Sequence, residues 1–230
     1  MAEGALAEQP GRGEAEPVKL SLMRRAMARR MSEAALVPCF YLRVTADAAP
    51  AMAARARLAE EAGDGPRPTL NDYLLVAVGR ALAAHPEVNA SYDEDGVTRH
   101  PRVNVGVAIS VPDGLVVPAV YDADRKGLAE VATATRELAA AAAERRLGRD
   151  VLSDATFTVS NLGMFGIEDF DPVLNPPQAA ILGVGAAAPA DAEGRRALRL
   201  TLGCDHRVLT GTEGARFLGT VKDELERAGA

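Results

Sequence analysis

The stretch Leu-Arg-Leu-Thr-Leu-Gly-Cys-Asp-His-Arg-Val-Leu-Thr-Gly-Thr-Glu-Gly-Ala-Arg at residues 198–216 decides the fold that we predict for this chain of 230 residues. A half-buried strand is indicated by Leu198, Leu200 and Leu202, which alternate with polar or small residues. The strand runs into Asp-His-Arg, and glycines follow before a final helix. A histidine at a strand end, beside a glycine-bearing turn, is held by rigid backbone and open on one side, which suits a general base.

The composition is that of an ordinary globular protein. Hydrophobic residues make up 48% of the chain, but aromatic residues only 4% with no tryptophan, so we expect an aliphatic core. The net charge of -6 argues against a nucleic-acid surface. The sequence has no apolar run of membrane-spanning length and no signal peptide. Cys39 and Cys204 match neither a disulfide framework nor a metal site. We therefore predict a reduced, cytoplasmic protein without metal, nucleic-acid partner or membrane partner.

Hydrophobic periodicity predicts mixed helices and strands within one domain over residues 18–230, after a disordered leader at residues 1–17 that is rich in Ala, Glu, Gly and Pro. Helices are expected after Ser21, over 49–61, from Thr69 or Asn71 to Ala84, over 127–147 and after Gly211. Strands are expected over 39–46, 156–159 and 198–202, with a strand or turn at 89–96. Two further strands, 103–111 and 115–120, are predicted to form a hairpin through Pro-Asp-Gly.

Several motifs resemble one known family. Asp-His-Arg-Val-Leu-Thr-Gly at 205–211, followed by Gly-Ala-Arg-Phe, is similar to the active-site motif of the dihydrolipoamide acyltransferase catalytic domain, the core component of 2-oxoacid dehydrogenase complexes. Phe-Thr-Val-Ser-Asn-Leu-Gly-Met-Phe-Gly at 157–166 and Asn-Pro-Pro-Gln-Ala-Ala-Ile-Leu at 175–182 resemble the same family. The resemblance covers roughly residues 18–228 and extends, through a related histidine motif, to chloramphenicol acetyltransferase.

The resemblance implies an α/β fold of the two-layer α+β kind, in which a mixed sheet like that of chloramphenicol acetyltransferase packs with helices. It also implies a homotrimer, which in some family members assembles further into cubic cores. Acetyl-CoA or coenzyme A is the implied cosubstrate. We expect no lipoyl attachment in this chain, because its short leader has room for neither a lipoyl domain nor a subunit-binding domain.

The resemblance also assigns roles to individual residues. His206 corresponds to the general base, and Ser160 to the hydroxyl that stabilises the oxyanion from a neighbouring subunit. Supporting positions are Asn161, Asp205 and Gly211. Arg30, in the helix after Ser21, corresponds to an arginine that approaches the aspartate of the histidine motif. Thr210 stands where the family carries that aspartate, and Cys39 where it carries a histidine.

Other residues with reactive side chains receive plainer interpretations. Cys204 could be proposed as a nucleophile, but a cysteine on an alternating strand is more often a small core residue. His85 precedes Pro86 at a helix end, and His100 lies in a loop or at an edge, so neither is assigned to catalysis.

Three functions follow from these observations. The first is a stand-alone acyltransferase that moves an acetyl group from acyl-CoA to a small-molecule hydroxyl or thiol, for example in bacterial tetronate biosynthesis. It is favoured by the short leader and the changes at Cys39 and Thr210. The alternative is the dihydrolipoyl acyltransferase core of a 2-oxoacid dehydrogenase complex. A further alternative is a structural core without catalytic activity.

Overall fold

The structure, a computed structural model, describes residues 15–61 and 67–228. Residues 1–14 of the predicted leader lie outside this range, and so does the Gly-Asp-Gly-Pro stretch that we expected to end the helix over 49–61. Residues 15–17 are exposed and have no regular structure. No helix in these two described ranges is long and apolar enough to cross a membrane.

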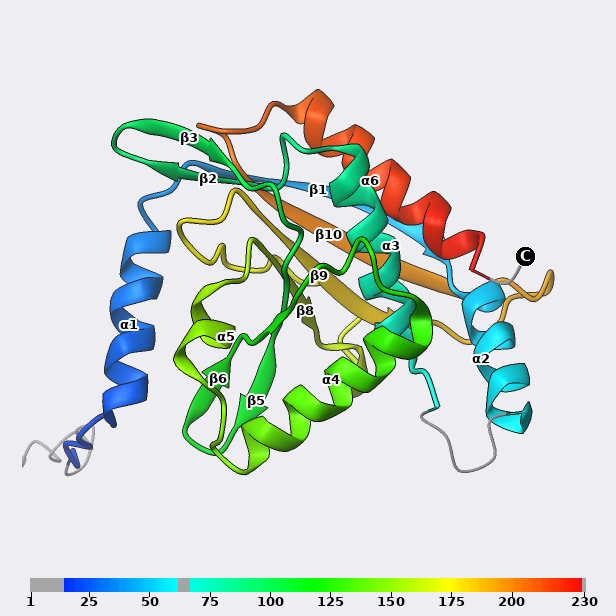
Figure 1. Ribbon diagram of the computed structural model, residues 1–230, viewed down its shortest axis with the longest axis horizontal. Helices are drawn as coiled ribbons and strands as arrows, with labels where there is room; N and C mark the ends of the chain where they lie inside the picture. Colours follow the sequence, from blue (N-terminus) through cyan, green and yellow to red (C-terminus); the bar gives the residue numbers. More distant parts are fainter. Residues whose placement is uncertain (1–14, 62–66, 229–230) are drawn as a thin grey trace, which may run out of the picture.

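A six-stranded mixed sheet forms the centre of the fold, in the order β1-β10-β9-β8-β4-β7 (Figure 1). The neighbouring pairs β8–β9 and β4–β8 are parallel, and the other three pairs are antiparallel. The long pair β1 and β10 stays in register over nine residues, because the alternating leucines of β10 put one face of the strand in the core. The strands are β1 Cys39–Asp47, β4 Val105–Val107, β7 Ala119–Val120, β8 Phe157–Asn161, β9 Ala180–Ala187 and β10 Ala197–Asp205.

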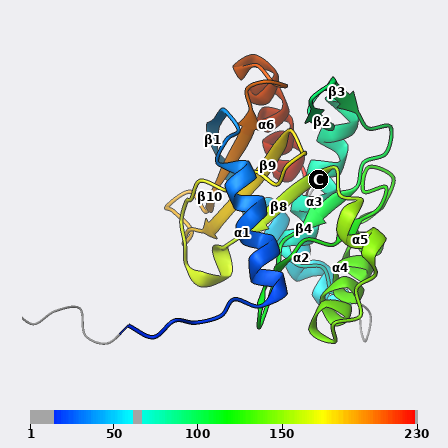
Figure 2. The same ribbon diagram turned by 90° about the vertical axis from the view of Figure 1, so that its left-hand side faces the viewer.

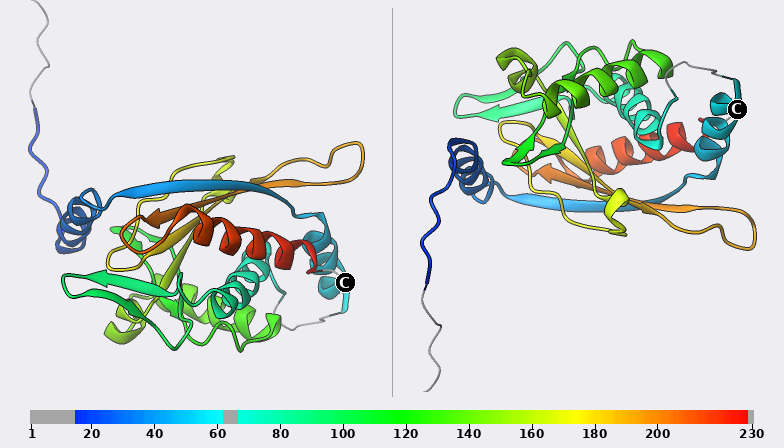
Figure 3. Two further views of the ribbon diagram at one scale, coloured as in Figure 1. Left: turned by 90° about the horizontal axis from the view of Figure 1, so that it is seen from above. Right: turned by 90° about the horizontal axis from the view of Figure 1, so that it is seen from below.

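Helices cover one face of this sheet, as Figure 3 shows from above and below. The central helix α3 is buried on almost every side and packs beside α6 and α4. It approaches the chain at Ala123 so closely that a Cβ at Gly79 would lie 2.7 Å from that backbone. Leu, Val and Ala dominate the core, as the composition predicted. The helices are α1 Leu22–Ala34, α2 Ala49–Glu61, α3 Leu70–Ala84, α4 Leu128–Ala143, α5 Arg149–Ser153 and α6 Gly211–Glu226.

The segment after β8 lies against the sheet at Gly183, Gly185 and Gly203. A Cβ at Gly183 would lie 3.1 Å from Pro172, and one at Gly185 would overlap the carbonyl oxygen of Glu168. The missing side chains therefore let backbone pack directly on the strands. This segment begins with the 3-10 helix η1 Gly163–Phe165.

Helix α1 lies outside these two layers (Figures 1 and 2). Ser21 caps it as predicted, with its hydroxyl accepting from the backbone N–H of Arg24 at 3.2 Å. Ala34 is its one buried residue. The helix contacts the rest of the chain through Met23, beside the β5–β6 hairpin, and through polar contacts of Arg30 that are described with the site.

The predicted hairpin over 103–120 is divided between two sheets. β4 and β7 pair within the main sheet, whereas β5 Ile109–Val111 and β6 Gly114–Val116 form a separate two-stranded sheet. Pro118 lies at the break and has no N–H to donate to a ladder. The segment 89–96 belongs to a second hairpin, β2 Ala90–Asp93 with β3 Gly96–Arg99. The mixed sheet layered with helices confirms the predicted fold class.

Candidate active site

His206 lies immediately after β10, on a short backbone turn held from several directions. The N–H of Asp205 donates to the carbonyl of Ala179 at 2.8 Å, and that of His206 to Pro38 at 2.9 Å. The N–H of Leu209 donates back to the carbonyl of Asp205 at 2.9 Å. The backbone around the histidine is therefore fixed by β9, by the start of β1 and by its own turn.

The imidazole of His206 is exposed, and it packs against one aromatic ring. The ring centroids of His206 and Phe40 lie 4.5 Å apart at an interplanar angle of 50°. Phe40 comes from β1, which pairs with β10, so the sheet itself brings the two rings together. A side chain held on one face and open on the other has room to exchange a proton with a bound group.

Asp205 is only 2% exposed, and Arg207 neutralises its carboxylate. The guanidinium donates through Nη2 to Oδ2 at 2.7 Å and through Nε to both oxygens, at 3.0 and 3.2 Å. The same guanidinium lies over the ring of Tyr92, with Cζ 3.9 Å from the centroid. Sequence analysis named Asp205 but gave Arg207 and Tyr92 no role.

Ser160 lies on β8, with Asn161 next to it. The Ser160 side chain is half-buried. The Asn161 amide group has a local task, because its Oδ1 accepts from the N–H of Gly163 at 2.8 Å and its Nδ2 donates to Asn71 at 3.3 Å. Asn161 thus fixes the turn that follows Ser160, and its carboxamide is engaged in that turn.

Ser160 and His206 cannot meet within one chain. Ser160 pairs with Gly183 on β9, whereas Cys204 pairs with Ala180, three residues earlier, and His206 lies beyond Cys204 in the direction away from Ser160. Strand β9 separates β8 from β10. The two residues are therefore separated by two strand spacings across the sheet, about 10 Å, and by at least three residues along the strands, about another 10 Å. A site that uses both side chains must therefore combine two subunits.

Thr210 and Gly211 start helix α6. Thr210 is its N-cap and forms a capping box with Glu213, whose Oε2 accepts from the N–H of Thr210 at 2.8 Å and from its Oγ1 at 2.7 Å. The backbone and side-chain hydrogen bonds from Thr210 lower the pKa of Glu213. Gly211 is exposed at the first position of the helix. Thr210 thus has an architectural contact of its own.

Arg30 contacts the segment just before β9 and makes no hydrogen bond to the turn of His206. Its Nε donates to Asn175 Oδ1 at 2.9 Å and its Nη2 to the carbonyl of Pro176 at 2.5 Å. Asp205 is paired with Arg207 instead, and position 210 carries no charge to attract a guanidinium. Arg30 therefore joins α1 to the segment just before β9.

The two cysteines lie close to the turn of His206 but differ in burial. Cys204 is fully buried, and burial, aided by the nearby Cys39 and Asp205, raises the pKa of its thiol to about 12. Cys39 is half-buried opposite Asp205 in the β1–β10 register, and burial raises the pKa of its thiol too. Neither thiol is thus activated as a nucleophile.

The remaining histidines have structural partners. His85 Nε2 lies 2.8 Å from Thr220 Oγ1, and its ring meets Phe217 edge-on. His100 Nε2 lies 3.1 Å from Ser91 Oγ, and burial lowers the pKa of that imidazole. No cluster of three or more metal-ligating side chains occurs in the parts of the chain that the structure describes.

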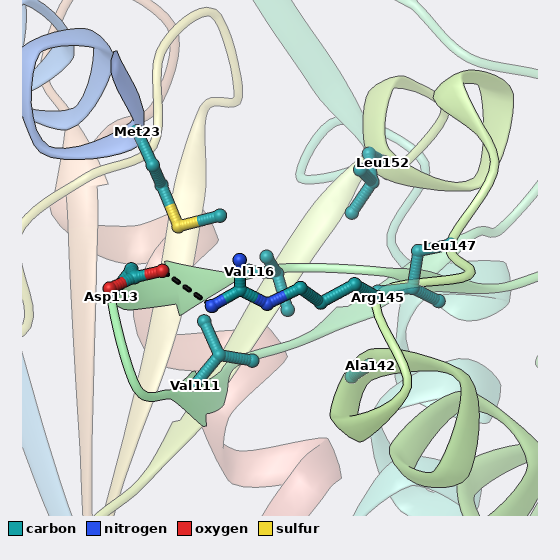
Figure 4. Close-up of a pocket in the computed structure, with 8 residues that line it drawn as sticks. All are labelled: Met23, Val111, Asp113, Val116, Ala142, Arg145, Leu147 and Leu152. Atoms are coloured by element: carbon teal, nitrogen blue, oxygen red, sulfur yellow. Dashed lines mark hydrogen bonds and ion pairs between the residues drawn. The ribbon is translucent and has the colours of Figure 1, made fainter. Parts of the chain in front are cut away.

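An apolar cavity of about 160 Å³ lies away from both Ser160 and His206 (Figure 4). It is bounded by α1, the β5–β6 hairpin, the end of α4 and α5. Met23 points into it from α1, and Arg145 crosses it to donate to Asp113 at 2.6 Å. The lining residues are Met23, Val111, Asp113, Val116, Ala142, Arg145, Leu147 and Leu152.

Comparison of sequences identifies one family over nearly the whole chain. The model of the 2-oxoacid dehydrogenases acyltransferase catalytic domain matches residues 12–229. The chain is 35% identical over 224 residues to the dihydrolipoyllysine-residue acetyltransferase component of the mitochondrial pyruvate dehydrogenase complex of Caenorhabditis elegans. That alignment covers 91% of this chain and 44% of the relative. The chain spans about half the length of the curated relatives it matches.

Solved structures agree with the sequences. The dihydrolipoamide acetyltransferase of Azotobacter vinelandii is similar with a TM-score of 0.88 and 32% identity, covering 94% of this chain and 93% of that one. Its catalytic mechanism has been studied through a serine, a histidine and an asparagine four positions after the histidine, the spacing of His206 and Thr210. The cubic core of a pyruvate dehydrogenase multienzyme complex gives 0.88 and 33%, with the same coverage.

Chloramphenicol acetyltransferase shares the fold, with a TM-score of 0.56 and 16% identity. The match covers 86% of this chain and 94% of that one. The full-length match to the family model, the identity with acetyltransferase components and the likeness to their catalytic cores thus agree with one another. The chain belongs to the 2-oxoacid dehydrogenase acyltransferase family and comprises its catalytic domain.

Proposed function

We propose that this protein is a dihydrolipoyl acyltransferase core, which moves an acyl group between coenzyme A and a dihydrolipoyl thiol. The observation that carries the proposal is the placement of an exposed, ring-packed His206 on a rigid strand end, with Ser160 on a strand that only another subunit can bring to it. The family membership supports this acceptor. It does not support the small-molecule hydroxyl acceptor of a stand-alone biosynthetic enzyme, which the short leader had favoured.

In the proposed reaction, His206 removes the proton from the acceptor thiol. The thiolate sulfur attacks the carbonyl carbon of the acyl thioester, and the carbonyl electron pair moves to oxygen. The partner subunit's Ser160 donates a hydrogen bond to that oxyanion. As the carbonyl re-forms, the coenzyme A sulfur leaves and takes the proton back from the imidazolium. The acyl group passes directly between sulfur atoms, so no cysteine of the chain is acylated.

The proposed assembly is a homotrimer, in which each site receives a histidine from one copy and a serine from the next copy around a three-fold axis. The similarity to the cubic core supports assembly of such trimers into a larger particle. A cytoplasmic location stays a prediction from the sequence. The dihydrolipoyl group would be supplied by a separate lipoyl domain, on this protein or on another chain.

The test is release of coenzyme A from acetyl-CoA in the presence of dihydrolipoamide, measured by chromatography. We expect rapid release by the unmodified protein, near-complete loss in His206→Ala, and a loss of about 100- to 1000-fold in kcat in Ser160→Ala. His85→Gln is the matched control and should retain kcat, because that ring contacts Thr220, Phe217 and Glu87 and no residue of the turn at His206. Release with alcohols but not with dihydrolipoamide would refute the proposed acceptor.

A further inference from the structure

We propose that Arg207 and Tyr92 are positioning residues for His206, an inference that rests on the proposed function. They act through the buried carboxylate of Asp205. Together they fix the backbone on both sides of the histidine, and through it the direction of an imidazole that would otherwise turn freely toward solvent.

The ion pair joins the two residues on either side of His206. Asp205 precedes the histidine and Arg207 follows it, and both carboxylate oxygens accept from the Arg207 side chain at 2.7–3.2 Å. The N–H of Arg207 also donates to Asp205 Oδ1 at 2.9 Å. A carboxylate buried to this degree needs such pairing, because an unpaired buried charge is strongly unfavourable. The pair therefore constrains the residue between its two members.

Tyr92 connects this ion pair to another part of the fold. Its aromatic face supports the guanidinium from β2, with Arg207 Cζ 3.9 Å from the ring centroid. The N–H of Tyr92 donates to Pro177 at 3.0 Å, and the N–H of Ala179 donates to Ala90 at 2.9 Å. Since Ala179 also accepts from Asp205, the tyrosine and the turn of His206 are held by the same stretch of chain.

The imidazole has little else to orient it. Within the described residues, neither ring nitrogen of His206 hydrogen-bonds to another side chain, and Phe40 supplies the one ring contact. The position of the ring thus depends on the backbone at 205–207. A general base must lie within hydrogen-bond reach of its proton, and a misplacement of about 1 Å can cost on the order of 100-fold in rate.

The chain contains a matched arrangement elsewhere. Arg102 pairs with Asp122 through two hydrogen bonds of 2.8 and 2.6 Å, and its Cζ lies 5.9 Å from the ring centroid of Tyr121. This Arg–Asp–Tyr group follows β3 and β7 in the chain. Arg102→Met therefore controls for the loss of such a pair at a place with no hydrogen bond to the turn of His206.

The first experiment measures steady-state kinetics of acetyl transfer from acetyl-CoA to dihydrolipoamide by the full chain. Arg207→Met should lower kcat by about 10- to 100-fold while KM for both substrates stays within about twofold. Arg207→Lys should recover part of kcat, and Tyr92→Phe should retain more of it than Tyr92→Leu, because the phenyl face can still support the guanidinium. If Arg207→Met does not fold, Tyr92→Leu carries the same test, since it leaves the ion pair intact. A kcat for these variants no lower than that of Arg102→Met would overturn the proposal.

A second measurement does not depend on activity. Diethyl pyrocarbonate modifies accessible imidazoles, and the chain has three histidines, so peptide mass spectrometry can follow each separately. We expect the modification rate of His206 to change by about threefold or more in Arg207→Met, with His85 and His100 unchanged as internal references. An unchanged rate at His206 would overturn the positioning role. If the unmodified protein transfers no acetyl group to dihydrolipoamide, the proposed function fails, and the labelling still decides the positioning role.

Discussion

At the scale of single residues, the reactive groups near His206 differ in how far the protein activates them. Cys204 is two residues away, yet its thiol is fully buried and its pKa is raised to about 12. A thiol in that state is almost entirely protonated at neutral pH and cannot act as a nucleophile. Proximity along the chain therefore does not make this cysteine catalytic.

We predict that Cys204→Ala retains the kcat of the unmodified protein, because the thiol serves only to fill space between β10 and α6. A modest loss of stability is expected from the small cavity, about 1 kcal/mol. Coenzyme A release and urea denaturation measure the two effects. A loss of activity as large as that of His206→Ala would instead assign the cysteine to the reaction.

At the scale of elements, the start of α6 is held by the reciprocal hydrogen bonds of Thr210 and Glu213. The pKa of Glu213 is lowered in the folded state from its ordinary value of 4.5. Its contribution to stability is therefore fully present above pH 4.5 and is lost as the pH falls through the lower folded-state pKa. The same capping box gives Thr210 a stabilising role at the start of α6.

We predict that Glu213→Gln is less stable than the unmodified protein at pH 7, and that the difference shrinks as the pH falls below 4.5. Thr210→Val, which removes the cap hydroxyl, should cost about 1 kcal/mol at pH 7. Urea denaturation at several pH values measures both. A stability difference between Glu213→Gln and the unmodified protein that is the same at pH 7 and in acid would contradict this account.

The segment after β8 packs directly against glycines of the sheet. Gly185→Ala should destabilise the protein by about 1–3 kcal/mol, because the new Cβ would overlap the carbonyl oxygen of Glu168 and backbone must move. Gly219→Ala is the matched control. It lies inside α6 with nothing within 4 Å of the new Cβ, so it should stabilise the protein by up to about 1 kcal/mol. Equal effects at the two positions would refute the packing argument.

At the scale of the whole molecule, strand order keeps Ser160 and His206 apart, and the proposed site needs two copies. We predict that Ser160→Ala and His206→Ala proteins, each with little activity alone, gain activity after they are unfolded together and reassembled. Random mixing gives about a quarter of the interfaces both native side chains, so activity should approach about a quarter of the unmodified level. Coenzyme A release measures it, and no gain in verified mixed assemblies would show that the site does not cross subunits.

Local patterns predicted much of this fold. The alternation of β10, the cap at Ser21 and the strand end carrying His206 each depend on a few neighbouring residues, and all are present in the structure. The break in the predicted 103–120 hairpin was missed, because the choice between two sheets depends on partners elsewhere in the chain. The contacts of Arg30 with Asn175 and of Arg207 with Tyr92 were also out of reach, since they join residues far apart in sequence.

The contact between Phe40 and His206 has an optical consequence. The chain contains no tryptophan, so Phe40→Trp would introduce a single indole against the imidazole. A protonated imidazole quenches indole emission far more than a neutral one does, so the fluorescence of this variant would report the proton on His206 directly. Arrival of a thiol or thioester at the open face of the ring would change the same signal, and the binding step could be followed in real time, apart from chemistry.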